Sequence, residues 1–109
     1  MRRGIRLQFY FPERERRHGK LLYEWLLNAA RDQGIKGGSV FRAIAGFGRH
    51  GTVHYDSFFE LAGTLPIEVR IVTTPELADK LLAFLAAEGE SLFYVRSEVE
   101  YGWTGDEER

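Results

Sequence analysis

The order of two apolar periods constrains this chain more than any other feature of its sequence. Four segments have the alternation or apolar content typical of strands: residues 4–11, 40–47, 65–73 and 91–101. Two others, residues 20–33 and the segment from Pro75 to near Gly89, place apolar side chains three and four positions apart, as a helix with one buried face requires. The predicted order is therefore strand, helix, strand, strand, helix, strand.

This order indicates an α+β, ferredoxin-like βαββαβ fold, in which two helices cover one face of a four-stranded antiparallel sheet. The 109 residues contain no linker-like stretch, so we expect a single domain, residues 1–109, with a polar tail at 102–109. The exposed sheet face is predicted to carry Arg6, Gln8, Tyr10, Val40, Arg42, Ile44, Glu68, Arg70, Val72, Tyr94, Arg96 and Glu98. Because several of these are apolar, we expect this face to pack against other subunits.

Composition excludes several classes of function. Fifteen basic and sixteen acidic side chains give a net charge of −1, which argues against a surface that binds nucleic acid. The chain has no cysteine, and no apolar run approaches the length of a membrane span. We therefore expect a cytoplasmic protein with no membrane insertion.

Residues 34–51, "GIKGGSVFRAIAGFGRHG", contain six of the twelve glycines and frame the second predicted strand. Glycine permits tight turns, which is one reading of this segment, and it also permits close approach of a ligand to bare amides. In the second reading Gly34, Gly37, Gly38, Gly46 and Gly48 border a cleft for a small anion, with charge added by Arg49. The long connection that follows, residues 48–64, is typical of a functional loop.

The same residues carry a resemblance. "GIKGGSVFRAIAGFGRHG", the long loop and "LPIEVRIVTTPE" resemble the PII signal-transduction proteins. The likeness is closer to the PII-like family called domain of unknown function 190, whose pattern is similar to "ERERRHGKLLYEWLLNAARDQGI", "SVFRAIAGFG" and "LPIEVRIV", and it extends over residues 5–101.

The resemblance implies a homotrimer that binds an adenine nucleotide in clefts between subunits and regulates a membrane transporter or enzyme through the loop at 48–64. The resemblance assigns the glycine turn to Gly34, Gly37 and Gly38, and a hydroxyl near the adenine base to Ser39. It also assigns the basic residue at the start of the loop to Arg49.

Other positions depart from the PII pattern. PII proteins bind phosphates with a glycine-rich, lysine-containing loop after the second helix and with two arginines on the last strand. Here the connection is "AEGES", and Tyr101 and Trp103 stand at the arginine positions. The basic segment "ERERRHGK", residues 13–20, is an alternative source of phosphate contacts if it folds over the same cleft.

Two alternatives to a nucleotide-binding regulator stay open. His50 and His54, with Asp56 and Glu60 nearby, are candidate ligands of a divalent metal, as in a CutA-like trimer. A structural interaction protein with no ligand is the other alternative. We expect no enzymatic activity, because the sequence has neither a nucleophile elbow nor a phosphate-binding Gly-Lys-Ser/Thr motif. An RNA-recognition module is disfavoured, because the strand at 65–73 contains no aromatic residue.

Overall fold

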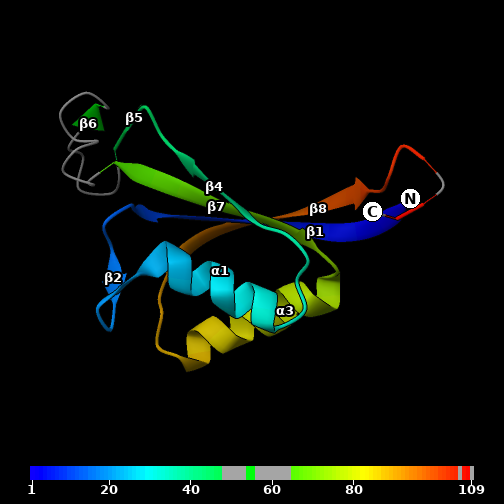
Figure 1. Ribbon diagram of the computed structural model, residues 1–109, viewed down its shortest axis with the longest axis horizontal. Coiled ribbons are helices and arrows are strands. Elements are labelled where there is room, and N and C mark those ends of the chain that lie inside the picture. The colour runs from blue at the N-terminus through cyan, green and yellow to red at the C-terminus, as the bar shows by residue number, and fades with distance from the viewer. Residues whose placement is uncertain (48–53, 56–64, 106, 109) are drawn as a thin grey trace.

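A computed structural model describes residues 1–47, 54–55, 65–105 and 107–108 of the chain. Four strands form an antiparallel sheet in the order β4-β7-β1-β8. Their bounds are β1 Arg2–Pro12, β4 Ser39–Arg42, β7 Pro66–Thr73 and β8 Phe93–Tyr101. Helices α1 (Leu22–Asp32) and α3 (Pro75–Ala87) cover one face of the sheet (Figure 1). The predicted ferredoxin-like α+β fold is confirmed.

Two short strand pairs lie outside this sheet. Strand β2 (Arg16–Arg17) pairs with β3 (Lys20–Leu21), and β5 (Ala45–Gly46) pairs with β6 (His54–Tyr55). The β5 strand and the β2–β3 hairpin both lie at the end of the sheet opposite the chain termini (Figure 1). Within the described part of the chain, no helix is long and apolar enough to cross a membrane.

The core lies between the helices and one face of the sheet. The alternation predicted for the first strand is confirmed, because Ile5, Leu7, Phe9 and Phe11 are buried while the three residues between them are only half-buried. Leu22 and Leu26 of α1 and Leu81 and Leu85 of α3 complete this core, each with at most 3% of its surface exposed. Burial of such side chains is the main force that holds helices of this length on a sheet.

The ends of the two helices follow from local sequence. Thr74 precedes α3, and its side-chain hydroxyl accepts a hydrogen bond from the Leu77 amide at 3.2 Å, which satisfies one free helix donor. Helix α1 begins two residues later than predicted, at Leu22, because Lys20 and Leu21 pair with the preceding arginines as β3. The chain leaves this helix through Gly34, whose φ of +94° suits glycine.

The predicted faces of two strands are wrong. In β4, Val40 lies opposite Val69 and Phe41 lies opposite Glu68. Since directly opposed residues share a face, Val40 faces the helices and Phe41 is on the open face, the reverse of the prediction. Arg42, which follows, is on the helix side with Val40.

The last strand has the same error. Tyr94, Arg96 and Glu98 lie opposite Phe9, Leu7 and Ile5, so they belong to the helix side of the sheet. Arg96 confirms this, because it forms an ion pair of 2.9 Å with Asp79 of α3. Phe93 and Val95 take their place on the open face, where they are 69% and 37% exposed.

The second strand is also shorter than the predicted span of residues 40–47. Strand β4 ends at Arg42, and the amide of Ala43 donates a last hydrogen bond of 3.0 Å to the carbonyl of Pro66. Proline has no backbone N–H and cannot donate a hydrogen bond to β4, so pairing with β7 stops there. The chain resumes strand geometry at Ala45, where it pairs with β6 instead.

Candidate functional site

The candidate ligand residues lie at opposite ends of β4. Gly34, Gly37 and Gly38 form the turn between α1 and β4, and Ser39 begins the strand. Gly46 lies in β5, past the other end of β4. Within one chain, therefore, these two groups do not form a single site. Gly48 and Arg49 lie outside the described residues, as does most of the loop at 48–64.

Two of the three turn glycines have a local structural reason. At Gly34 the amide donates to the Arg31 carbonyl and the next amide, of Ile35, donates to that of Ala30, which is the Schellman helix end. A side chain on Gly38 would place its Cβ 3.1 Å from Leu27. Gly37 differs, because nothing lies within 4 Å of an added Cβ and its backbone needs no positive φ.

A shallow hollow of about 260 Å³ adjoins this turn. Its lining comes from α1 and from the turn itself: Leu27, Asn28, Ala30, Arg31, Ile35, Lys36, Gly37 and Gly38. Arg31 and Lys36 give the hollow positive charge, and both side chains are largely exposed. Each cation has an acidic partner, Asp32 at 3.5 Å from Arg31 and Glu108 at 3.1 Å from Lys36. An anion that binds at this turn would therefore meet one unobstructed backbone segment and would exchange with a carboxylate.

The opposite end of the molecule carries a cluster that the sequence analysis missed. The β2–β3 hairpin turns through His18 and Gly19, both with positive φ, as a two-residue hairpin of this kind requires. The hairpin carries Arg17 onto the connection between α3 and β8. There its guanidinium donates to the carboxylates of Glu88 and Glu90 at 2.9 and 2.7 Å, and to the Glu88 carbonyl at 3.1 Å.

Arg17 also stacks on α1, with its guanidinium carbon 4.4 Å from the ring centre of Trp25. Its side chain is 12% exposed, and its Nε is buried without a hydrogen-bond partner. The basic 13–20 segment thus does fold over the "AEGES" connection. Its central arginine, however, is neutralised by that connection's own carboxylates and is not a bare cation.

A second ion pair ties the base of the long loop. Arg42 donates to both carboxylate oxygens of Glu13, from Nε at 2.9 Å and from Nη2 at 2.6 Å. The backbone adds a hydrogen bond of 3.0 Å from the Glu13 amide to the Leu65 carbonyl. The hydrogen bonds from Arg42 hold the pKa of Glu13 below its usual value. Glu13 therefore joins Arg42, which precedes the loop, to Leu65, which follows it.

The open sheet face combines a polar network with exposed apolar groups. Glu68 accepts hydrogen bonds from Tyr10 at 2.9 Å, from Gln8 at 3.1 Å and from Arg70 at 2.6 Å. Burial raises the pKa of Glu68, but these hydrogen bonds outweigh it and the pKa is lowered. For Tyr10, burial and then the bond to Glu68 raise the pKa of the phenol.

Apolar side chains surround this network. Phe41 lies under the Arg70 guanidinium at 4.7 Å, and Phe93 lies 6.0 Å from Tyr10 between ring centres. Phe41, Val72, Phe93 and Val95 are each at least 37% exposed on this face. A monomer would leave this group of side chains in water.

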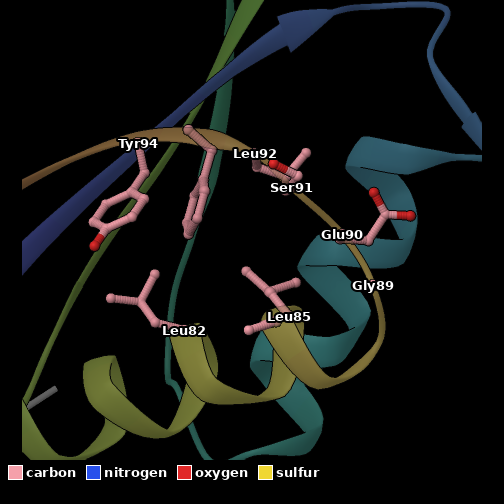
Figure 2. A pocket seen from close by; sticks show the side chains of 9 residues that line it. Leu82, Leu85, Gly89, Glu90, Ser91, Leu92 and Tyr94 are labelled. Carbon is pink, nitrogen blue, oxygen red and sulfur yellow. The ribbon is translucent and has the colours of Figure 1, made fainter.

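A larger groove of about 500 Å³ runs between α3 and β8. Leu82 and Leu85 point from α3 toward the strand, and Tyr94 points from β8 toward the helix (Figure 2). Glu90 lies at one end of the groove and is engaged by Arg17. The lining is mostly apolar, so it has little with which to bind an anion.

The histidines proposed as metal ligands are not tested by this geometry. His50 lies outside the described residues, and His54 is placed only as the first residue of β6. Among the residues that the structure describes, no group of three or more His, Cys, Asp or Glu side chains is arranged to hold a metal ion.

Solved structures share the fold. The structure of CPII bound to ADP and bicarbonate, from Thiomonas intermedia K12, superposes with a TM-score of 0.68 over 94% of this chain and 91% of that chain, at 17% identity. A putative PII-like signaling protein from Thermus thermophilus superposes with a TM-score of 0.59 over 91% of both chains, at 20% identity. CutA1 from Oryza sativa superposes with a TM-score of 0.60 over 92% of this chain and 83% of that chain, at 14% identity.

Sequence comparison identifies the family. A UPF0166 protein of Aquifex aeolicus is 36% identical over 76 residues, which are 70% of this chain and 72% of the relative. A UPF0166 protein of Methanocaldococcus jannaschii is 29% identical over 76 residues, 70% of this chain and 69% of the relative. The model of the family DUF190, described as "Uncharacterized ACR, COG1993", matches residues 4–101. The chain therefore belongs to the DUF190 family and has a PII-like fold.

Proposed function

We propose that this protein is a PII-like regulator that assembles as a homotrimer and binds an adenine nucleotide between subunits. The proposal is supported by the family, by the fold and by a structural neighbour that was solved with ADP. It places Gly34, Gly37, Gly38 and Ser39 on one wall of the cleft. Gly46, Gly48 and Arg49, at the other end of β4, belong to the facing wall.

The proposal depends mainly on one observation: the candidate residues lie in two groups at opposite ends of β4, so a single chain cannot bring them together. In addition, the open sheet face exposes apolar side chains. A second subunit accounts for both features. It covers the open face, and it brings the glycine turn at 34–38 of one subunit toward the loop at 48–64 of the next. Buried apolar area of this kind supplies most of the stability of an oligomer interface.

We propose a regulatory and not a catalytic role. The loop at 48–64 is the segment that contacts the regulated partner, a membrane transporter or an enzyme. Glu13 contacts Arg42 before this loop and the Leu65 carbonyl after it, so a change at the cleft is transmitted to the loop through a fixed base.

Sedimentation and isothermal titration with ATP, ADP, AMP and cyclic nucleotides test the proposal. We expect a trimer and heat with at least one nucleotide. Gly37→Ala adds a methyl group where nothing lies within 4 Å, so it should leave folding stability unchanged while it weakens binding. Gly105→Ala, equally unobstructed but in the tail, is the matched control. A monomer, or no heat with any nucleotide, contradicts the proposal.

A second candidate function is supported by the likeness to rice CutA1. In that case His50 and His54 of symmetry-related subunits bind a divalent metal such as copper or zinc. This function predicts that either metal raises the melting temperature and that a His50→Ala, His54→Ala double variant loses the increase. A ligand-free interaction protein would respond neither to metal nor to nucleotide.

A further inference from the structure

The C-terminal tail returns to the glycine turn through one carboxylate. Glu108 contacts two cations from distant parts of the chain: its Oε2 lies 2.6 Å from Nη2 of Arg2, and its Oε1 lies 3.1 Å from Nζ of Lys36. Arg2 begins β1, and Lys36 lies between Gly34 and Gly37 in the turn. Each carboxylate oxygen therefore contacts one cation, and because the single negative charge is shared between them, the cluster keeps a net positive charge.

The two cations lie close enough to contact one carboxylate, and one of them, Lys36, also borders a hollow. Lys36 lines the hollow of about 260 Å³ beside the turn, together with Arg31. The guanidinium of Arg2 is held 5.2 Å from the ring centre of Trp103, which orients it toward the tail. Arg2 pairs directly with Tyr101 across the β1–β8 ladder, so the backbone fixes its position beside the start of the tail.

The tail contact is exchangeable. All three charged groups are solvent-exposed, with 36% of the Glu108 side chain, 53% of Arg2 and 86% of Lys36 in contact with water. Exposed ion pairs of this kind hold weakly, each by at most about fivefold in an equilibrium constant. The tether nevertheless keeps the carboxylate at a high local concentration. A phosphate group has more acceptor oxygens and more charge, so it is the stronger partner for the same cations.

We infer that Arg2 and Lys36 form a phosphate-binding pair at the glycine turn and that Glu108 is its internal competitor. The inference rests on the proposed function, because it assigns further residues to the same cleft. The tail residue occupies the pair when no ligand is bound, and the phosphate of a nucleotide displaces it. The tail thereby sets the ligand concentration at which the protein responds.

The test compares Glu108→Gln with Glu107→Gln, a neighbouring carboxylate on the same tail. Titration with ADP and with inorganic pyrophosphate should show binding about two- to tenfold tighter for Glu108→Gln and unchanged for Glu107→Gln. The gain should disappear when Lys36→Gln is added to Glu108→Gln. Pyrophosphate separates recognition of the phosphates from recognition of the nucleoside, for which adenosine is the probe. Equal affinities for wild type and Glu108→Gln overturn the inference and leave the proposed function intact.

Acylation of Lys36, followed by mass spectrometry, provides a readout that does not depend on nucleotide binding. Loss of the Glu108 contact should raise the rate of acylation at Lys36, and pyrophosphate should protect this amine more strongly in Glu108→Gln than in the wild type. If ADP binds to no variant, the proposed function fails. The phosphate pair then stands on this protection alone, and equal or absent protection overturns it.

Discussion

The guanidinium of Arg17 stacks on the ring of Trp25 at 4.4 Å while it donates to two carboxylates of the α3–β8 connection. One side chain thus joins a hairpin, a helix and a loop that are far apart in the sequence. Because Arg17 forms an ion pair with both Glu88 and Glu90, its removal also leaves these carboxylates without their counter-charge.

Arg17→Ala should lower the free energy of unfolding by about 1–3 kcal/mol, because it removes the cation–π contact and the charge-assisted hydrogen bonds together. Arg16→Ala, on the same hairpin but exposed and bonded to the Gly19 carbonyl, is the control and should cost less. Urea unfolding monitored by Trp fluorescence measures both. Equal losses for the two variants would show that the contacts of Arg17 with Trp25, Glu88 and Glu90 together add nothing to stability.

Glu13→Gln tests the ion pair at the loop base by its pH dependence. The pKa of Glu13 is lowered in the folded state, so the charged form stabilises the fold above the ordinary value of 4.5. That contribution is lost as pH falls through the lowered folded-state pKa. The wild type should therefore exceed Glu13→Gln in stability by up to about 1 kcal/mol at pH 7, and the difference should vanish in acid. A difference that is independent of pH would contradict the assignment.

The fold was predictable because its strongest signals are local. The alternation from residue 4 to residue 11 identified β1, and Pro75 marked the start of α3, since each pattern acts through neighbours in the sequence. The faces of β4 and β8 were not predictable in this way. Val40 and Phe41 are both apolar, as are Phe93, Tyr94 and Val95, so only pairing with a neighbouring strand decides which side each one takes.

The candidate site was predictable only in part. The sequence located the glycine turn directly after the predicted helix at 20–33, because such a turn depends on backbone conformation within a few residues. The contacts of Arg17 with Glu88 and Glu90 span more than seventy residues, and those of Glu108 with Arg2 span more than one hundred. No periodicity or spacing reports such pairs, which arise from the way the β2–β3 hairpin and the tail fold back.

Phe93→Asp tests assembly through the open sheet face. The side chain is 69% exposed in the single chain, and we expect a neighbouring subunit to cover it. A charge at that position would be buried in the trimer, so the variant should sediment as a smaller species while it keeps its circular dichroism spectrum. Ala83→Asp places the same charge on α3, away from this face, and should leave assembly unchanged. Trimers of both variants would exclude this face as the interface.

Tyr10→Phe removes one donor to Glu68 and leaves those of Gln8 and Arg70 in place. The hydroxyl also accepts a hydrogen bond of 3.2 Å from Gln8, so the expected loss of stability is about 1–3 kcal/mol, the net value of two hydrogen bonds. Because the pKa of Tyr10 is raised on folding, this contribution is complete below its ordinary pKa of 10.0 and is lost as pH rises through the folded-state value. The chain has five tyrosines, so the difference between the absorbance titrations of the wild type and of Tyr10→Phe, each folded and urea-unfolded, measures the shift of this phenol. Burial and then the hydrogen bond to Glu68 raise this pKa, so an unshifted titration would contradict both.

Gly4→Ala tests the packing of the tail end of β8 on β1. An added Cβ would lie 2.5 Å from the ring of Tyr101 and 2.8 Å from the Thr73 carbonyl oxygen, and the backbone oxygen has no room to move. We expect a loss of about 1–3 kcal/mol in the free energy of unfolding, typical of overpacking. Gly37→Ala meets nothing within 4 Å and is the control, with an expected change within about 0.5 kcal/mol or a slight gain. Chemical denaturation of both variants decides, and a Gly4→Ala protein as stable as Gly37→Ala would mean that Tyr101 does not cover this part of β1.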